Sequence, residues 1–426
     1  MKKTSQSDGP LVAVVSHLWM GHIPGYHRLI VERAHKLGWR VVSITPDGRE
    51  LPGAAKSYRY HLGEIDPGLG DQGARVRTKG GLVARLRAML FPRGLGISTA
   101  RRARRNWRSL ARVLREAEQD EHRPLDFAFI VYLGYNFLEV GVSPGFLEKI
   151  LPCAWGGIWN GPTPGRNNQS PLVARLWSCE APLRARNCRT VWVPHRRLVE
   201  RFQSFNLKTR VMAMPEIADL RPAAVDCAAV QRLLAAAAGR RITGLLGCIS
   251  LRKGIMTLIE AAQIAVRDAP ELFFIAAGEF SRGLCGDDYD GIAAVAARAP
   301  ANFLFLPGRI PEGPEFNAHV VALDVLYAVY RDFPFQSNLL TKAAHFRKPV
   351  LVASGEVMAS CTSEFDLGGV VPADDPQAVL NGIRSVLGGC RPDGQRLRPR
   401  FEEFSAMNEV SLLDDLLVAT VGKERV

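Results

Sequence analysis

The sequence predicts an α/β protein made of two doubly wound parallel-sheet domains that face a cleft. Three observations support this fold class. The chain has 426 residues, of which 47% are apolar and 23% charged, an ordinary composition for two globular domains. Short valine-rich runs alternate with segments of helical periodicity, a pattern typical of βαβ units. The alternation occurs in two blocks, separated by a segment at 214–224 with two prolines and no periodicity.

The first block, 1–213, is expected to begin with a βαβ unit. The apolar run at 11–15 predicts a buried strand, 27–36 has apolar residues at helical spacing, and 39–45 predicts a second strand. The unit has no G-x-G-x-x-G fingerprint, so no dinucleotide cofactor is expected. The remaining elements expected in this block are strands at 126–132, 154–159, 190–193 and 208–212 and a helix at 195–205.

The second block, 214–400, repeats the alternation and is expected to form the second domain. Its expected strands are 243–249, 272–277, 302–306, 321–327, 349–353 and 369–371, and its expected helices are 255–266, 338–346 and 376–387. Ligands of open parallel sheets bind beyond the carboxyl ends of the strands. The loops that follow these strands are therefore where a site is expected.

The positive charge of the chain is concentrated in one segment. The net charge is +13, and residues 72–115 contain 13 Lys or Arg and no acid, so they account for the whole excess. Apolar residues at helical spacing predict a basic amphipathic insertion at about 72–118. Contact with an anionic membrane surface or acceptor, a solvated helix packed on the sheet, and nucleic-acid binding remain as interpretations. The candidate contact residues are Arg101, Arg102, Arg104, Arg105, Trp107 and Arg108.

Several classes of protein do not fit the sequence. The eight cysteines include no C-x-x-C pair, and the histidines form no H-x-x-x-H pattern, so no metal site is expected. No run of about 18 apolar residues predicts a spanning helix. We expect reduced cysteines and a cytoplasmic protein, held at most on the inner face of the membrane. Nucleic acid is not an expected partner, because no aromatic stacking platform accompanies the arginines.

Four stretches of the second block have residues suited to a phosphate-bearing ligand. Lys253, in the loop SLRKG between a strand and a helix, would place an ammonium beside a positive helix end. A solvated basic turn is the alternative. Ser337 or Asn338 would cap a second helix whose amides could meet another phosphate edge. Strand ends at Gly278 and Gly308 would permit close backbone approach.

These stretches have a familiar order. LRKGIMTLIEAA, FFIAAGE, FLFLPGRI and LLTKAAHFRKPVLVA, within 243–388, resemble the nucleotide-sugar-binding half of GT-B glycosyltransferases, in particular glycosyltransferase family 4. MGHIPGYHRLIVERAHKLGWRVVSIT is similar to the Gly-rich loop, helix and second strand of the acceptor half of that family. The resemblance implies two Rossmann-like domains. It also implies a single terminal helix, about 401–426, that crosses back to the first domain.

The resemblance implies glycosyl transfer from a nucleotide diphosphate sugar to a saccharide or lipid-linked acceptor, without a metal or other cofactor and with retention at the anomeric carbon. Lys253 and His22 are the implied catalytic residues. Gly21, Gly25 and His27 are the implied acceptor-side loop. The implied donor-binding residues are Arg252, Gly278, Glu279, Gly308, Arg309, Ile310, Gln336, Ser337, Asn338 and Lys342.

The sequence also departs from the family. The two glutamates usual before the P-V strand are replaced by Pro334 and Lys342. A lysine cannot accept hydrogen bonds from ribose hydroxyls, although Lys342 could contact a diphosphate. The alternative function is therefore a non-catalytic GT-B scaffold that binds a sugar, a lipid or a partner enzyme. A basic adaptor for nucleic acid is a third, weaker hypothesis.

Overall fold

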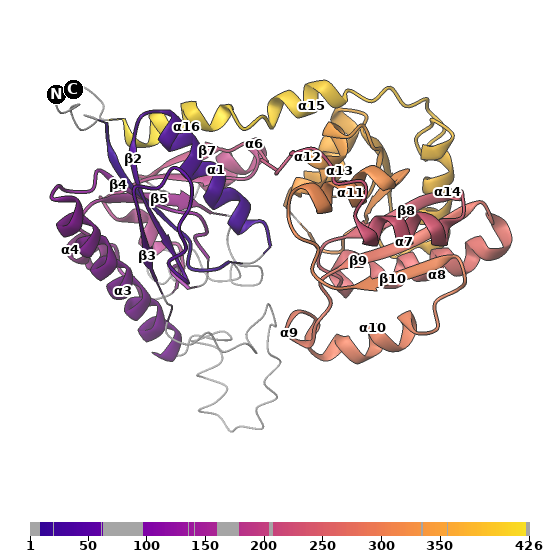
Figure 1. Ribbon diagram of the computed structural model, residues 1–426, viewed down its shortest axis with the longest axis horizontal. Helices are drawn as coiled ribbons and strands as arrows, with labels where there is room; N and C mark the ends of the chain where they lie inside the picture. Colours follow the sequence, from indigo (N-terminus) through magenta and orange to yellow (C-terminus); the bar gives the residue numbers. More distant parts are fainter. Residues whose placement is uncertain are drawn as a thin grey trace. The chain divides into compact units, whose positions relative to one another are not determined.

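The computed structural model describes residues 9–19, 21–60, 62, 97–134, 136–139, 141–159, 179–203, 208–333, 335–355 and 357–422. The chain forms two compact units, each with its own parallel sheet (Figure 1). In the described residues, the first unit holds the chain up to Pro215 together with the segment from Ser411, and the second holds Glu216–Val410. Leu82, Leu86, Met89 and Leu90, on which part of the expected insertion depends, lie outside the described residues.

The first unit has a seven-stranded parallel sheet in the order β3-β2-β1-β4-β5-β6-β7. β1 is buried along its whole length, as its run of apolar residues requires. The polar strand β3 was not expected from the sequence, because it lies at the sheet edge and has no apolar run. The strands are β1 (Leu11–Val15), β2 (Arg40–Thr45), β3 (Lys56–Arg59), β4 (Phe127–Ile130), β5 (Ala154–Ile158), β6 (Cys188–Val193) and β7 (Arg210–Ala213).

The helices of the first unit are α1 (Ile23–Lys36), α3 (Ile97–Glu121), α4 (Pro144–Ile150), the 3-10 turn η1 (Ala181–Arg184), α6 (Arg196–Gln203) and α16 (Leu412–Val421). α1 begins four residues before the expected start of its helix at 27. Pro24 accounts for the difference, because a proline suits the first turn of a helix.

The C-terminal segment is two helices rather than the single one expected from the sequence. α15 (Phe401–Met407) belongs to the second unit, and α16 belongs to the first. α16 packs against α1, where Arg33 Nε donates to Asp414 Oδ1 at 2.7 Å. The indole Nε1 of Trp192 in β6 donates to Thr420 Oγ1 at 3.0 Å. These contacts make the end of the chain part of the first unit.

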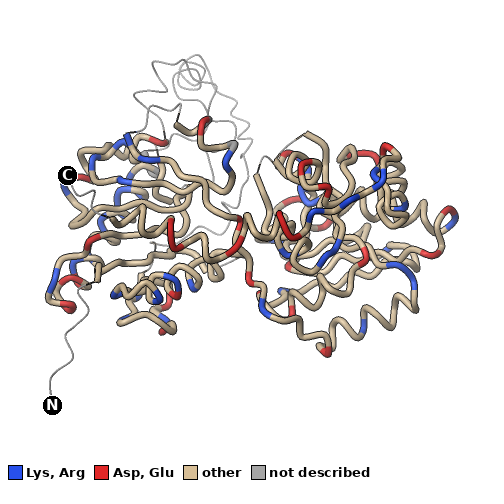
Figure 2. Tube along the Cα trace, turned by 90° about the horizontal axis from the view of Figure 1, so that it is seen from above, with Lys and Arg blue, Asp and Glu red and all other residues tan. Residues whose placement is uncertain are grey.

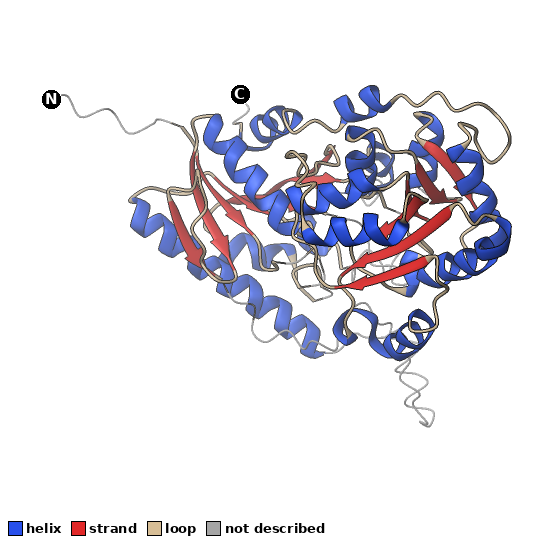
Figure 3. Cartoon of the chain, turned by 45° about the vertical axis from the view of Figure 1, so that its right-hand side comes forward, coloured by secondary structure: helices blue, strands red, loops and turns tan. Residues whose placement is uncertain are grey.

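The second unit has a six-stranded parallel sheet in the order β10-β9-β8-β11-β12-β13. Neighbouring residues of one strand enter different apolar clusters, as Leu245 and Leu246 do, so both faces of the sheet are buried. Helices cover the sheets of both units (Figure 3). The strands are β8 (Arg241–Leu246), β9 (Leu272–Gly278), β10 (Phe303–Pro307), β11 (Val325–Ala328), β12 (Val350–Ala353) and β13 (Gly368–Val371).

The helices of this unit, besides α15, are α7 (Ala228–Ala237), η2 (Leu251–Lys253), α8 (Ile255–Asp268), α9 (Arg282–Cys285), η3 (Gly286–Asp288), α10 (Tyr289–Ala296), α11 (Pro314–Ala322), α12 (Asn338–His345), α13 (Val357–Glu364) and α14 (Pro376–Leu387). The strand expected at 321–327 is wrong at its start, because residues 321 and 322 end α11. In the described part of the chain, no helix is long and apolar enough to cross a bilayer.

Candidate functional site

The strand order of the second unit reverses between β8 and β11. At such a switch point the connections leave the sheet in opposite directions and open a crevice beyond the carboxyl ends of the strands. The loop after β8 carries Lys253, and the loop after β11 carries Tyr330 and Phe333. The two loops are joined by a backbone hydrogen bond from Arg331 N to Arg252 O at 2.8 Å.

Lys253 is the central cation of this site. It ends η2, is half-buried, and places Nζ 3.6 Å from the centroid of the Tyr330 ring and 5.4 Å from that of Phe333. Within the described residues its ammonium has no ion-pair partner. A cation held against aromatic faces keeps its N–H groups for an anion. The adjacent N-terminus of α8 contributes positive potential to the same place.

Gly254 and Gly278 show how closely the backbone approaches at this edge. Gly254 has φ +73°, and a Cβ there would lie 2.3 Å from Val329 O. Gly278 has φ +143°, and a Cβ there would lie 1.6 Å from Gly247 O. Gly308 N donates to Gly278 O at 2.8 Å, so the turns after β9 and β10 are linked. Gly254 and Gly278 therefore have room for backbone only, whereas a Cβ at Gly308 would meet no atom.

Four charged residues of the predicted donor site affect the pKa of Cys248, a half-buried thiol just after β8. Burial raises the pKa of this thiol. The positive charges of Lys253, Arg252 and Arg309 lower the pKa, and the negative charge of Glu279 raises it. All four charged side chains are thus near one point, although they come from the ends of three strands. The balance of three cations and one carboxylate favours an anionic ligand. Ile310 follows Arg309 and is partly buried against the apolar core.

The N-terminus of α12 is capped by its own chain. Ser337 Oγ accepts a hydrogen bond from Leu339 N at 3.4 Å, which confirms the predicted cap. Gln336 and Ser337 are buried, and Asn338 is half-buried. The Ser337 hydroxyl is therefore engaged, and a ligand would meet the backbone amides of this turn rather than that side chain.

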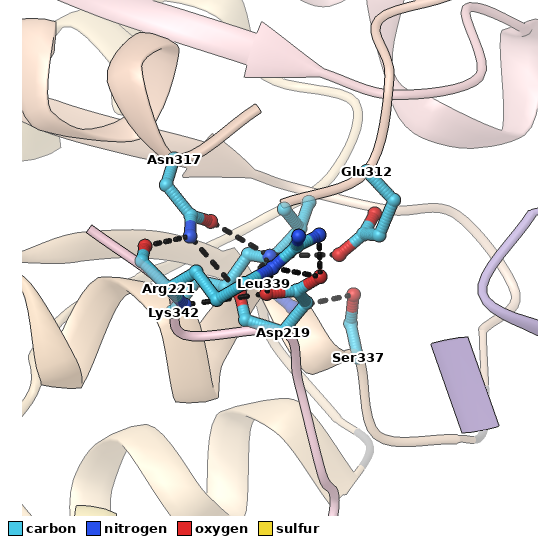
Figure 4. A network of polar contacts seen from close by, with 7 residues as sticks. All are labelled: Asp219, Arg221, Glu312, Asn317, Ser337, Leu339 and Lys342. Carbon is cyan, nitrogen blue, oxygen red and sulfur yellow. Dashed lines mark hydrogen bonds and ion pairs between the residues drawn. The ribbon is translucent and has the colours of Figure 1, made fainter. Parts of the chain in front are cut away.

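Lys342 does not lie where the sequence interpretation placed it. Its side chain is 0% exposed. Nζ donates to Asp219 O at 2.7 Å and Asn317 Oδ1 at 2.8 Å, and it pairs with Glu312 Oε1 at 2.7 Å (Figure 4). An ammonium has three protons, and all three have protein acceptors. The expected contact between Lys342 and a diphosphate is therefore wrong, and the residue instead anchors the linker to α11 and α12.

The predicted acceptor-side residues of the first unit have different environments. His22 is exposed at the start of α1, with its ring 4.8 Å from that of Tyr26. Gly21 is exposed with φ +56°, and Gly25 lies in the first turn of α1. His27 is 0% exposed, and its Nδ1 and Nε2 lie 2.8 Å from Ser16 Oγ and 2.9 Å from Ser43 Oγ. The expectation that His27 contacts an acceptor is wrong, because both ring nitrogens are already paired inside the protein.

The described part of the basic segment, α3, packs its apolar face on the sheet of the first unit. Trp107 is 0% exposed, and its Nε1 donates to Phe137 O at 2.9 Å. It is a core residue, so the expected contact of Trp107 with a membrane is wrong. The arginines lie on the other faces: Arg101, Arg104, Arg105 and Arg108 are exposed and Arg102 is half-buried. Arg104 Nε donates to Gly141 O at 2.8 Å. Basic positions are marked along the trace in Figure 2.

Sequence reasoning missed Tyr330, Phe333 and His17. Tyr330 is 4% exposed and its hydroxyl has no hydrogen-bond partner in the described chain. His17 is 3% exposed just beyond β1. Tyr330 and His17 each lie two residues after a buried strand, which was the available signal, since such positions lie at the ligand-binding edge of a parallel sheet. Phe333 lies farther along the loop after β11. Among the described residues, no group of three or more His, Cys, Asp or Glu is arranged to hold a metal.

Comparison with known proteins supports the fold. No family model matches the sequence, and no curated protein is significantly similar to it. Trehalose 6-phosphate synthase from Burkholderia multivorans is 14% identical with a TM-score of 0.66, over 97% of this chain and 98% of that one. Sucrose-phosphate synthase from Thermosynechococcus elongatus is 14% identical with a TM-score of 0.64, over 96% and 98%. Trehalose-6-phosphate from E. coli, bound with UDP-2-fluoro glucose, is 11% identical with a TM-score of 0.64, over 96% and 98%.

The two parallel-sheet α/β units and these similarities define the class: the chain has the GT-B fold. The predicted fold class is confirmed in these terms. The finer resemblance, to glycosyltransferase family 4, is not confirmed by the comparisons and stays a prediction.

Proposed function

We propose that the protein is a glycosyltransferase that moves a sugar, of the hexosyl class, from a nucleotide diphosphate sugar to a saccharide or lipid-linked acceptor. One observation carries the proposal. Lys253, half-buried and without a carboxylate partner among the described residues, lies at the switch point of the second unit beside the start of α8. The similar structures include synthases of trehalose and sucrose phosphates, and one is bound with UDP-2-fluoro glucose.

The proposed chemistry places positive charge where the leaving diphosphate becomes more negative. Lys253, Arg252 and the amides at the start of α12 would stabilise that charge, which lowers the barrier to loss of the nucleoside diphosphate. Gly278 would let the phosphates approach the backbone. Glu279 would accept hydrogen bonds from donor hydroxyls, and Gly308, Arg309 and Ile310 would flank the base. These groups would act without a metal ion, and retention at the anomeric carbon is part of the proposal.

On the acceptor side, His22 and the loop glycines Gly21 and Gly25 would meet the acceptor or the transferred sugar. His22 is exposed at the start of α1, where a side chain is accessible to a ligand. A His ring can act as donor or acceptor in this role.

The exposed face of α3 supports a second, separate proposal. Its arginines could hold the protein against an anionic surface on the cytoplasmic side of a membrane, which would suit a lipid-linked acceptor. Because the apolar face of α3 is buried in the core, this contact would be electrostatic and would not involve insertion of the helix.

The alternative, a GT-B scaffold without activity, rests on the two missing glutamates, whose positions hold Pro334 and Lys342. Pro334 lies outside the described residues. The environment of Lys342 provides a structural reason for a lysine at that position, because it anchors the linker through Asp219. Loss of the glutamate at position 342 is therefore explained without loss of donor binding through Lys253.

The experiment that separates the two is a measurement of nucleoside diphosphate release. The full chain is incubated with UDP-, GDP-, ADP- and dTDP-sugars, with and without a panel of saccharide acceptors. Release that depends on the acceptor and is lost in Lys253→Ala supports the transferase. Donor binding with no release under any acceptor supports the scaffold.

A further inference from the structure

The hydroxyl of Tyr330 is a buried polar group that the described residues do not satisfy. Tyr330 lies two residues after β11, in the loop at the switch point, and is 4% exposed against an apolar cluster of the second unit. Its hydroxyl has no hydrogen-bond partner in the described part of the chain. A buried hydroxyl without a partner costs free energy, and such groups are rare in folded proteins. A group of this kind therefore requires an explanation.

Two other buried tyrosines show that this protein pairs such hydroxyls where it can. Tyr327, three residues earlier in β11, donates from its hydroxyl to Gly254 O at 3.0 Å. Tyr60 of the first unit donates to Asn106 O at 2.9 Å. Burial alone therefore does not leave a tyrosine unpaired in this fold. The difference is position, because Tyr330 lies beyond its strand, at the edge where a parallel sheet binds ligands.

The ring that carries this hydroxyl also holds the cation of the site. Lys253 Nζ lies 3.6 Å from the centroid of the Tyr330 ring, and its ammonium has no ion-pair partner among the described residues. Because a phenol oxygen is bonded to the ring itself, the hydroxyl and the ammonium are neighbours. Both groups have a proton to donate, and one phosphate group spans the distance between them with hydrogen bonds of ordinary length.

The loop holds Tyr330 in place within the protein. The next residue, Arg331, donates from its backbone N to Arg252 O at 2.8 Å and from its guanidinium to Thr257 Oγ1 at 3.2 Å. Phe333 packs edge-on against the Tyr330 ring, with centroids 5.3 Å apart. A side chain that is already fixed loses little conformational freedom when a ligand binds. The hydroxyl is therefore preorganised, as is the ammonium beside it.

We propose that Tyr330 is a further binding residue at the switch point of the second unit, whose hydroxyl donates a hydrogen bond to the phosphate group that Lys253 also binds. An ammonium offers donors only, so Lys253 cannot accept the hydroxyl proton. An anionic oxygen accepts from both groups, and hydrogen bonds to a charged acceptor are the stronger class. A neutral ligand would leave the charge of Lys253 without a partner. The ligand class that satisfies both groups is a diphosphate.

As part of the donor site this inference rests on the proposed function, but phosphate binding is tested separately. The full chain and its Tyr330→Phe variant are titrated calorimetrically with inorganic pyrophosphate and with UDP, GDP and ADP. Phenylalanine keeps the ring face against Lys253 and removes only the hydroxyl. Pyrophosphate and at least one nucleoside diphosphate are expected to bind the wild type. Tyr330→Phe is expected to bind them about tenfold more weakly, because a hydrogen bond to a charged group is lost.

The stability of the ligand-free protein separates this binding role from a structural one. Tyr330→Phe removes an unsatisfied hydroxyl, so it is expected to melt at the wild-type temperature or above. Tyr327→Phe is the matched control, because it removes a hydroxyl that is paired with Gly254 O. Its melting temperature is expected to fall by about 2–4 °C.

The inference is overturned if neither pyrophosphate nor any nucleoside diphosphate binds the folded wild type, or if Tyr330→Phe binds them as tightly. It is also overturned if Tyr330→Phe melts as low as Tyr327→Phe, as it would if a buried water or a protein group held the hydroxyl of Tyr330.

The proposed function fails in a different way. Pyrophosphate binding that depends on Tyr330, with no release of nucleoside diphosphate from any sugar donor, supports this inference and overturns the transferase. Acceptor-dependent release, with equal phosphate binding by the wild type and Tyr330→Phe, supports the transferase and overturns this inference.

Discussion

The ammonium of Lys253 lies 3.6 Å from the centroid of the Tyr330 ring, although the two residues come from loops after different strands of the second sheet. The contact exists because β8 and β11 are neighbours across the switch point. The aromatic face orients the cation without neutralising its charge.

Lys253→Ala is expected to weaken nucleotide-sugar binding by about tenfold to a hundredfold, because a charge-assisted hydrogen bond to a phosphate is lost. The matched control is Arg267→Ala, which removes a surface cation from the last turn of the same helix that Lys253 precedes. It is expected to bind as the wild type does. Calorimetric titration of both variants checks this, and equal weakening in the two would contradict a local phosphate contact.

Gly278→Ala is expected to destabilise the second unit by a few kcal/mol, roughly 2–4, since its Cβ would overlap Gly247 O. Gly291→Ala is the control, because Gly291 lies inside α10 with no atom near its missing Cβ. That change is expected to stabilise by about 0.5–1 kcal/mol. Chemical unfolding of both variants decides the point, and equal effects would show that the strand ends are not tightly apposed.

Lys342→Met is expected to lower the free energy of unfolding by about 3–5 kcal/mol, because it leaves the buried partners of Nζ unpaired. The folded fraction should bind nucleotide sugar with wild-type affinity, since Lys342 has no free proton for a ligand. Glu312→Gln, which keeps an acceptor for Nζ, should cost less stability than Lys342→Met. If Lys342→Met lost affinity for the nucleotide sugar without losing stability, Lys342 would be a donor-binding residue after all.

Acid is expected to destabilise the first unit. Burial lowers the pKa of both His17 and His27 to about 3, with a further contribution from Arg28 at His27. Between about pH 6.5 and pH 3 the unfolded chain binds protons that the folded unit does not, so the free energy of unfolding falls as pH falls. Each histidine contributes up to about 1.4 kcal/mol per pH unit.

All seven tryptophans lie in the first unit's part of the sequence, so their fluorescence reports its unfolding. Urea titrations between about pH 7 and pH 4 measure the slope. His17→Phe should reduce the contribution of these two histidines by half, and an unchanged slope would show that His17 is not buried as described.

Replacement of Arg101, Arg105 and Arg112 by glutamine is expected to weaken binding to vesicles containing anionic lipid by about fivefold per arginine. Added salt is expected to weaken the binding of the wild type as well, because it screens the attraction between arginine and lipid. Trp107→Phe should leave vesicle binding unchanged, because Trp107 is inside the core. Co-sedimentation tests both variants. Weaker vesicle binding by a folded Trp107→Phe would contradict the placement of this face of α3.

The order of strands and helices could be predicted because each strand has a local apolar run. β1 was predicted with its observed bounds, and α14 likewise. β3 could not be predicted, since an edge strand such as KSYR is specified by pairing with β2 rather than by its own sequence. Residues 321–322 were assigned to a strand because apolar residues at the end of a buried helix have the same local appearance.

The site was partly predictable for the same reason. Lys253 and the strand-end glycines follow directly from their position after predicted strands. The burial of His27 depends on Ser16, which follows β1, and Ser43, which lies in β2, and these two residues meet only in the folded sheet. Likewise the partners of Lys342 come from the linker, the loop before α11 and α11 itself, so nothing near position 342 in the sequence indicates a buried cation.

The most direct test of the account is calorimetric titration of the full chain with UDP-, GDP-, ADP- and dTDP-sugars, followed by titration of Lys253→Ala and Arg267→Ala with the sugar that binds. We expect one sugar to bind clearly, with an affinity that falls in Lys253→Ala and stays at the wild-type value in Arg267→Ala. Binding that is equally tight in Lys253→Ala, or the absence of binding by every donor to a folded wild type, would contradict a nucleotide-sugar site at the switch point of the second unit.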